Sequence, residues 1–395
     1  GSEMCIRDRN DNNNENNNIG LIGDIISKSD AATVERMVNF VEISDANNEG
    51  ANLSLQVLSS VADATLLYSV EFGNEEQTQI DRLMQEAVFS AANSEDGAIY
   101  LANIMSKGSE DSVFMMMDTI GQVGDTDPNS TLALEVLSSM AENESFEDIN
   151  FGDQGQDLFD DMMEDAVYSA ADSEDGASML ANMMANGSEE SMGMMMETIG
   201  QVGETFADST LALEVLSSMA ENESFEDINF GDQGQDLFDD MMEDAVYSAA
   251  DSEDGASMLA NMMANGSEES MGMMMETIGQ VGETFADSTL ALEVLSSMAE
   301  NESFDDMNFE GEGKAQFDQM METAVFSAAN SEDGAMMLGN MMANGSEESM
   351  GMMMDTIRKV GDTNPNSTLA LEVLSSMAEN DLSLIHISEP TRRRG

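Results

Sequence analysis

Apolar residues recur along this chain at the three- and four-residue spacing of amphipathic helices, and no window alternates apolar and polar residues as a strand would. Four such stripes follow one another between residues 131 and 209. The pattern predicts four helices in this stretch and an all-α fold. The apolar positions are, stripe by stripe, Leu132, Val136, Leu137, Met140 and Ala141; Leu158, Phe159, Met162, Met163, Ala166, Val167 and Ala170; Ala177, Leu180, Met183 and Met184; and Met192, Met195, Met196, Ile199 and Val202.

Short polar segments separate these stripes and contain the residues that usually begin and end helices. Gly187 is predicted to end the third helix in the left-handed conformation that glycine adopts at little cost. Ser188 is predicted to cap the fourth helix, and two glutamates follow it at the positive end of the helix dipole. The same capping arrangement is predicted at Ser173 and in the segment that begins at Asp208.

The stripes belong to a long tandem repeat. Within a unit, VLSSMAENES from Val136 resembles MLANMMANGS from Met179, an internal offset of 43 residues, which predicts two unequal helix pairs per unit. Helix pairs stacked at a fixed period are typical of an α-solenoid. The predicted fold is therefore an all-α solenoid of tandem 79-residue units. The motif NLSLQVLSS or TLALEVLSS begins, at steps of 79 residues, at Asn52, Thr131, Thr210, Thr289 and Thr368.

The repeat divides the chain, and its two ends do not belong to the pattern. Both ends resemble translated sequencing-adapter read-through of the kind that caps metagenomic fragments, and they contain the only cysteine and the only histidine, Cys5 and His386. We leave them out of the reasoning about the fold. The predicted divisions are end segments at 1–9 and 382–395, a polar linker at 10–21, partial repeats at 22–51 and 368–381, and repeats at 52–130, 131–209, 210–288 and 289–367.

The chain is strongly acidic, with 80 acidic and 12 basic residues and a formal net charge of -68. Such a charge repels phosphate, so the expected partners exclude nucleic acid and are a basic or repetitive protein surface, or a second copy of the chain. No run approaches 18 apolar residues, which predicts no membrane insertion. Histidine and cysteine, the usual general base and thiol nucleophile, are missing between the two ends, so no catalytic residue and no enzyme are predicted.

Carboxylates are concentrated on the second helix of the central units, where hard oxygens suit weak binding of Ca²⁺ or Mg²⁺. The counterparts of Asp157 in the first and fourth units are Thr78 and Ala315, so we expect diffuse accumulation of cations without a fixed site. No other cofactor is predicted. The candidate metal-binding residues are Asp157, Asp160, Asp161, Glu164 and Asp165.

The methionine run MGMMM suggests a site for a soft metal, because thioethers bind Cu(I) and Ag(I). Met192, however, corresponds to Val113 one unit earlier, and valine ligates nothing. Packing is therefore the preferred interpretation of the inward methionines. One methionine per unit points away from the apolar face and is a candidate contact for a partner; these are Met115, Met194, Met273 and Met352.

These features predict a structural or interaction protein without enzymatic activity: an acidic helical-repeat spacer or scaffold within a larger polypeptide, in an extracellular or cell-surface location. Two alternatives stay open. One is an acidic extracellular or matrix repeat in which Ca²⁺, Mg²⁺ or salt relieves self-repulsion. The other is a methionine-rich binder of Cu(I) or Ag(I).

Overall fold

The computed structural model describes residues 36–41, 53–63, 74–94, 96–127, 130–142, 152–206, 209–221, 231–252, 254–285, 288–300, 312–345, 347–365 and 367–388. Within these ranges the chain forms helices and turns and no strand, which confirms the predicted all-α class. The predicted first end, the linker and most of the first partial repeat lie outside the described residues.

One complete set of helices is α7 (Leu132–Glu142), α8 (Gly152–Ala171), α9 (Gly176–Asn186) and α10 (Glu189–Thr205). Short and long helices alternate in this set. The pair α7–α8 spans residues 132–171 and the pair α9–α10 spans residues 176–205, which confirms two unequal pairs per unit. The first helix of the set recurs 79 residues later as α11 and again as α15. The further helices are α3 (Leu53–Asp63), α4 (Asn74–Ala91), α5 (Gly97–Ser106), α6 (Glu110–Thr126), α11 (Leu211–Glu221), α12 (Gly231–Asp251), α13 (Gly255–Asn265), α14 (Glu268–Thr284), α15 (Leu290–Glu300), α16 (Glu312–Ala328), α17 (Gly334–Asn344), α18 (Glu347–Thr363) and α19 (Leu369–Ser388).

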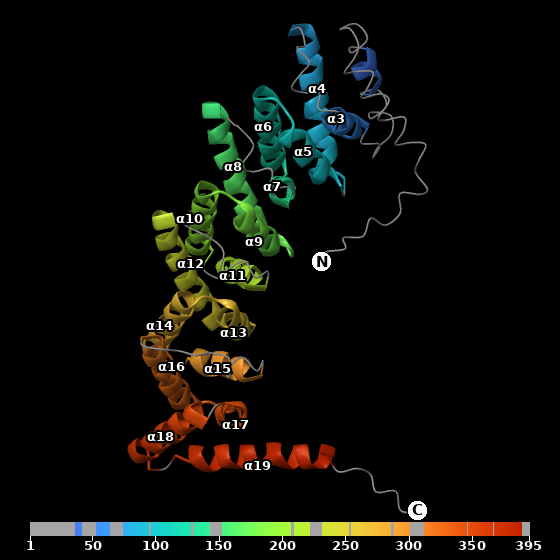
Figure 1. Cartoon of the computed structure of the whole chain (residues 1–395). Helices are drawn as coiled ribbons and strands as arrows, with labels where there is room; N and C mark the ends of the chain where they lie inside the picture. The colour runs from blue at the N-terminus through green and yellow to red at the C-terminus, as the bar shows by residue number, and fades with distance from the viewer. Residues whose placement is uncertain are drawn as a thin grey trace, which may run out of the picture. The chain divides into compact units, whose positions relative to one another are not determined.

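The chain forms two compact units, residues 1–198 and 199–395, and each unit has two layers of helices. In the first unit the short helices α3, α5, α7 and α9 pack one on the next, and the long helices α4, α6 and α8 form a second row beside them. In the second unit, α11, α13, α15 and α17 form the short row, and α12, α14, α16 and α18 form the long row (Figure 1). This is the stacking of an α-solenoid.

The predicted apolar stripes form the core between the two layers. Every residue of the four stripes between 131 and 209 is buried except Leu158, which is partly exposed. Methionines contribute much of this core: Met163 and Met184 have no exposed surface, and Met196 has almost none. Flexible thioether side chains fill the space between helices as other apolar side chains do, so these positions pack.

The helix boundaries confirm one predicted cap and correct the reason for a glycine. Ser188 caps α10, since its Oγ accepts a 3.2 Å hydrogen bond from the N–H of Ser191. Gly187 follows α9 as predicted, but its backbone is extended, with φ at −86°, and the predicted left-handed conformation is wrong. Glycine is required there for space, because a Cβ atom would lie 2.8 Å from the carbonyl oxygen of Met183.

The cap predicted at Ser173 is also wrong. Helix α9 begins at Gly176, and its N-cap, Asp175, makes no capping hydrogen bond with its side chain. The turn from α8 is too tight for an extended capping residue, since a Cβ on Gly176 would lie 2.5 Å from the Cα of Ala170. Asp208 lies outside the described residues, and in its segment Ser209 makes the contact, accepting a 3.4 Å hydrogen bond from the N–H of Leu211.

Candidate ligand-binding site

The loop that joins two successive units is held by a set of local hydrogen bonds. After α6, the N–H of Asp127 donates to the carbonyl oxygen of Val123 at 2.8 Å, and the N–H of Ser130 donates to that of Asp127 at 2.9 Å. Thr131 then donates through Oγ1 to Glu135 Oε1 at 2.6 Å. These bonds place hydroxyl and carboxylate groups at the start of α7.

The same bonds recur at the next two junctions. Ser288 N–H donates to the carbonyl oxygen of Phe285 at 2.8 Å, and Thr289 Oγ1 donates to Glu293 Oε1 at 2.5 Å. Thr210 pairs in the same way with Glu214. The repetition in sequence thus reproduces a repeated arrangement of polar groups at the beginning of each short helix that starts a unit.

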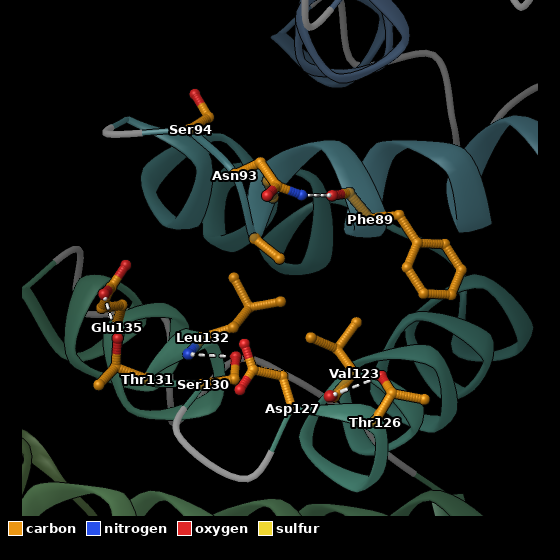
Figure 2. Close-up of a pocket in the computed structure, with 12 residues that line it drawn as sticks. Phe89, Asn93, Ser94, Val123, Thr126, Asp127, Ser130, Thr131, Leu132 and Glu135 are labelled. Atoms are coloured by element: carbon orange, nitrogen blue, oxygen red, sulfur yellow. Dashed lines mark hydrogen bonds between the residues drawn. The ribbon is translucent and has the colours of Figure 1, made fainter. Parts of the chain in front are cut away.

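A cavity of about 710 Å³ lies next to the loop between α6 and α7. The end of α4 and the turn after it form one wall, and the end of α6 and the start of α7 form the other. Figure 2 shows Val123 and Leu132 on one side of this space and Phe89 at its edge. The lining residues are Phe89, Ala91, Ala92, Asn93, Ser94, Val123, Thr126, Asp127, Ser130, Thr131, Leu132 and Glu135.

A second cavity of about 620 Å³ lies in the second compact unit, at the equivalent place between α12, α14 and α15, and it extends to the end of α10. Eight of its positions are those of the first cavity moved by two repeat periods, as Tyr247 and Glu293 correspond to Phe89 and Glu135. Equivalent positions of the repeat therefore line both cavities. Its lining residues are Gly203, Glu204, Ser209, Thr210, Asp244, Tyr247, Ser248, Ala250, Asp251, Phe285, Ser288, Thr289, Leu290 and Glu293.

The second cavity contains a carboxyl group in an unfavourable environment. Burial raises the pKa of Asp244 above its ordinary value, and the negative charges of Glu243, Asp240 and Glu204 raise it further. Asp165, one period earlier in the first compact unit, has its pKa raised in the same way, by burial first and then by neighbouring carboxylates that include Asp125. Both groups carry their charge at a cost that a bound cation would reduce.

The predicted carboxylate cluster is spread along α8. Asp157, Asp161, Glu164 and Asp165 are exposed, Asp160 is partly exposed, and none of the cluster lines the first cavity. Among the residues that the structure describes, no three acidic side chains come together as ligands of a metal ion. Diffuse accumulation of Ca²⁺ or Mg²⁺ along this helix remains a prediction. The counterpart of Asp165, Asp244, does line the second cavity.

The outward methionines Met115, Met194, Met273 and Met352 are all half-buried. None of them lines either cavity, and their role as partner contacts remains a prediction. In the part of the chain that the structure covers, no helix combines the length and the apolar character needed to cross a bilayer.

Sequence reasoning missed the cavity residues because they come from segments that are far apart. Phe89 and Glu135 lie on either side of the first cavity and belong to different repeats of the sequence. The available signal was the aromatic residue that recurs every 79 residues as Phe89, Tyr168 and Tyr247 at partly exposed positions. Together with the Ser-Thr pair that recurs before α7, α11 and α15, it indicated a repeated polar and aromatic surface.

No protein-family model matches the chain, and no curated protein matches it. Its fold is similar to those of several Puf proteins. PUF-8 in complex with PBE-RNA is 12% identical, with a TM-score of 0.45, over 84% of this chain and 93% of that one. The Puf4 RNA binding domain bound to the HO endonuclease RNA 3′ UTR recognition sequence is 10% identical, with a TM-score of 0.39, over 86% and 95%. The Puf3 RNA binding domain bound to Cox17 RNA site B is 13% identical, with a TM-score of 0.40, over 87% and 99%. At these identities the likeness concerns the helical-repeat fold alone.

The predicted function and partners are corrected by this comparison. The net charge led us to exclude nucleic acid and to expect an acidic scaffold facing a basic or repetitive protein surface. PUF-8, Puf4 and Puf3 are each bound to RNA in the structures named above, which contradicts the exclusion of nucleic acid, and the scaffold and its alternatives are withdrawn. Net charge describes the averaged field of a chain, whereas a helical repeat recognises ligands through the local side chains of each unit.

Proposed function

We propose that this chain is a modular ligand-binding repeat protein without catalytic activity, in which the repeat builds equivalent pockets beside the loops between units. The observation that supports this proposal is the recurrence of the cavity at eight equivalent positions two periods apart. Eight equivalent positions line both cavities, so the repeat itself places a pocket beside the loop in each of the two compact units.

The size and construction of the cavities suit a ligand. Volumes of about 620 and 710 Å³ lie within the range of small-molecule sites. The Thr131–Glu135 hydrogen bond and its counterpart Thr289–Glu293 already hold these polar groups of the lining in place, which lowers the cost of ordering them when a ligand binds. The threonine hydroxyls donate hydrogen bonds to glutamates of the helices that they precede. This arrangement holds the hydroxyl and carboxylate groups in position to contact a ligand, which supports binding over catalysis.

The proposal is tested by filling the pockets from their rims. Ala92 and Ala250 occupy equivalent lining positions, and both side chains are exposed, so Ala92→Trp and Ala250→Trp place a large ring in each cavity without disturbing the core. Ala264→Trp, at an exposed position on α13 that lines neither cavity, is the matched control.

The ligands to be tested are single-stranded RNA oligonucleotides, aliphatic polyamines, neutral oligosaccharides and short peptides, measured by calorimetry with the full chain. RNA is included because the similar solved structures hold it. We expect at least one class to bind the wild type and Ala264→Trp equally and to lose affinity in the double variant Ala92→Trp/Ala250→Trp. If every class that binds is unaffected by the two pocket substitutions, the pockets are not the binding sites and the proposal is wrong.

A further inference from the structure

We infer that the cavity between α10, α12, α14 and α15 binds a linear aliphatic polyamine; this rests on the proposed function and names the ligand class of one of its pockets. Carboxylates alone do not mark a site on this chain, because they cover much of its surface. What distinguishes this place is that a cavity, two aromatic rings and a row of hydroxyl groups occur together with the acids.

The aromatic rings give the cavity its affinity for an alkyl ammonium group. Tyr247 lies on α12, and Phe285 follows α14 with 54% of its surface exposed. An ammonium or the methylene beside it is attracted to the face of such a ring, by roughly 0.5–1 kcal/mol at exposed sites. The exposed face of Phe285 at the edge of the cavity is available to a ligand's methylene chain.

The charged residues of the lining are all acidic, and they are distributed. Glu204 comes from α10, Asp244 and Asp251 from α12, and Glu293 from α15. Neither lysine nor arginine lines this cavity. Glu293 already accepts a hydrogen bond from Thr289 at one oxygen, and a carboxylate has further capacity to accept N–H groups. The serine and threonine hydroxyls of the lining add neutral acceptors between these charges.

This distribution favours an elongated cation over a compact one. In the described ranges no three acidic groups converge on a point, as a metal ion requires, whereas a polyamine carries its charges along a chain and meets separated carboxylates one at a time. The environment of Asp244 agrees with this interpretation, because partial desolvation and three neighbouring carboxylates raise its pKa, and an ammonium group would relieve that repulsion.

The first cavity supplies an internal comparison. Its residues at the positions of Asp251 and Phe285 are Asn93 and Asp127, so it has one aromatic side chain and two carboxylates. With a shorter row of charges and one aromatic wall, it should bind the same polyamine more weakly. The two cavities thus predict two classes of site with different affinities on one chain.

The experiment is calorimetric titration of the full chain with spermidine at about 0.15 M salt, where distant surface charges are largely screened. Tyr247→Leu and Phe285→Leu remove a ring and keep a smaller apolar side chain at positions that are at least partly exposed, so the fold should be preserved. We expect each to weaken the tighter site about two- to fivefold, which is the value of an exposed cation–ring contact. Phe114→Leu, at an exposed phenylalanine that lines neither cavity, should leave it unchanged.

A second measurement separates a shaped site from attraction by charge alone. Hexaamminecobalt(III) carries the same three positive charges as spermidine but is compact and has no methylene chain. We expect spermidine to bind the tighter site more strongly than the cobalt complex. We also expect Glu204→Gln/Glu293→Gln to weaken spermidine binding more than Glu276→Gln, which changes an exposed glutamate outside the cavity.

Equal binding of the two cations, with no effect of Tyr247→Leu, would overturn the inference. If another ligand class is lost in Ala92→Trp/Ala250→Trp while spermidine does not bind, the inference fails and the proposed function stands.

Discussion

The hydroxyl of Ser248 donates a 3.2 Å hydrogen bond to the carbonyl oxygen of Ser209, although 39 residues separate them in the chain. The bond ties the end of α12 to the loop before α11, and both residues line the second cavity. Ser169 makes the same bond to Ser130 in the first compact unit, at 3.2 Å. In both places, the loop between two repeat units is thus held by a helix of the repeat unit that follows the loop.

Removing this bond should loosen the loop. Ser248→Ala leaves the carbonyl oxygen of Ser209 without that donor, and a hydrogen bond of this kind contributes about 1 kcal/mol to the free energy of unfolding. We expect a loss of that size in urea denaturation, and weaker ligand binding in the adjacent cavity. Ser257→Ala, at an exposed position on α13, is the control and should change neither quantity. An equal loss in both variants would show that the hydrogen bond between Ser248 and Ser209 does not stabilise the loop.

The raised pKa of Asp244 makes a prediction about pH. Its pKa is raised in the folded chain, so the folded state holds the proton more tightly than the unfolded state does. The stability that this group contributes is fully present below its unfolded pKa, near 3.8, and is lost as the pH rises through its folded pKa. At neutral pH the ionised carboxylate therefore opposes folding.

Asp244→Asn should raise the free energy of unfolding at pH 7 by about a few tenths of a kcal/mol for each repulsive pair relieved, and should have little effect at pH 3. Denaturation midpoints measured between these two pH values test this dependence. Asp236→Asn, an exposed position earlier on the same helix, controls for the removal of one negative charge from an acidic chain. A gain of equal size in the two variants would show that net charge, and not the environment of Asp244, determines the effect.

The fold could be predicted from the sequence because its main determinant is periodic and local. Positions such as Leu137 and Met163 are apolar at helical spacing and are buried in the structure. The turns could not be predicted in the same way. Gly187 and Gly176 are required by contacts with the backbone of the preceding helix, and glycine in a sequence does not distinguish lack of space from a positive φ. The cavities depend on how residues of neighbouring units meet, which no single stripe contains.

Two glycine substitutions should have opposite effects on stability, because the space around the two glycines differs. The first, Gly255, lies at the tight turn between α12 and α13. A Cβ on Gly255 would lie 2.5 Å from the Cα of Ala249, which is backbone and cannot rotate away. Gly255→Ala should therefore destabilise the chain by about 1–3 kcal/mol. Gly351 lies within α18 with nothing within 4 Å of its added Cβ, so Gly351→Ala should stabilise by about 0.5–1 kcal/mol. Thermal unfolding of both variants checks the signs, and a stable Gly255→Ala would contradict the steric account of the turn.

Two adjacent methionines of α14 separate a packing role from an outward one. Met274 has no exposed surface, whereas Met273 is half-buried. Truncating a fully buried methionine to alanine removes apolar contacts and leaves a cavity, at a cost of about 2–5 kcal/mol. We therefore expect Met274→Ala to lower the urea midpoint strongly and Met273→Ala to lower it by less than half as much, since neighbouring side chains and water can occupy the partly open space that Met273 leaves. The two substitutions delete the same atoms from consecutive residues of one helix, so helix propensity is the same for both. Similar losses would show that Met273 is packed as firmly as Met274, and would exclude Met273 as a contact for a partner.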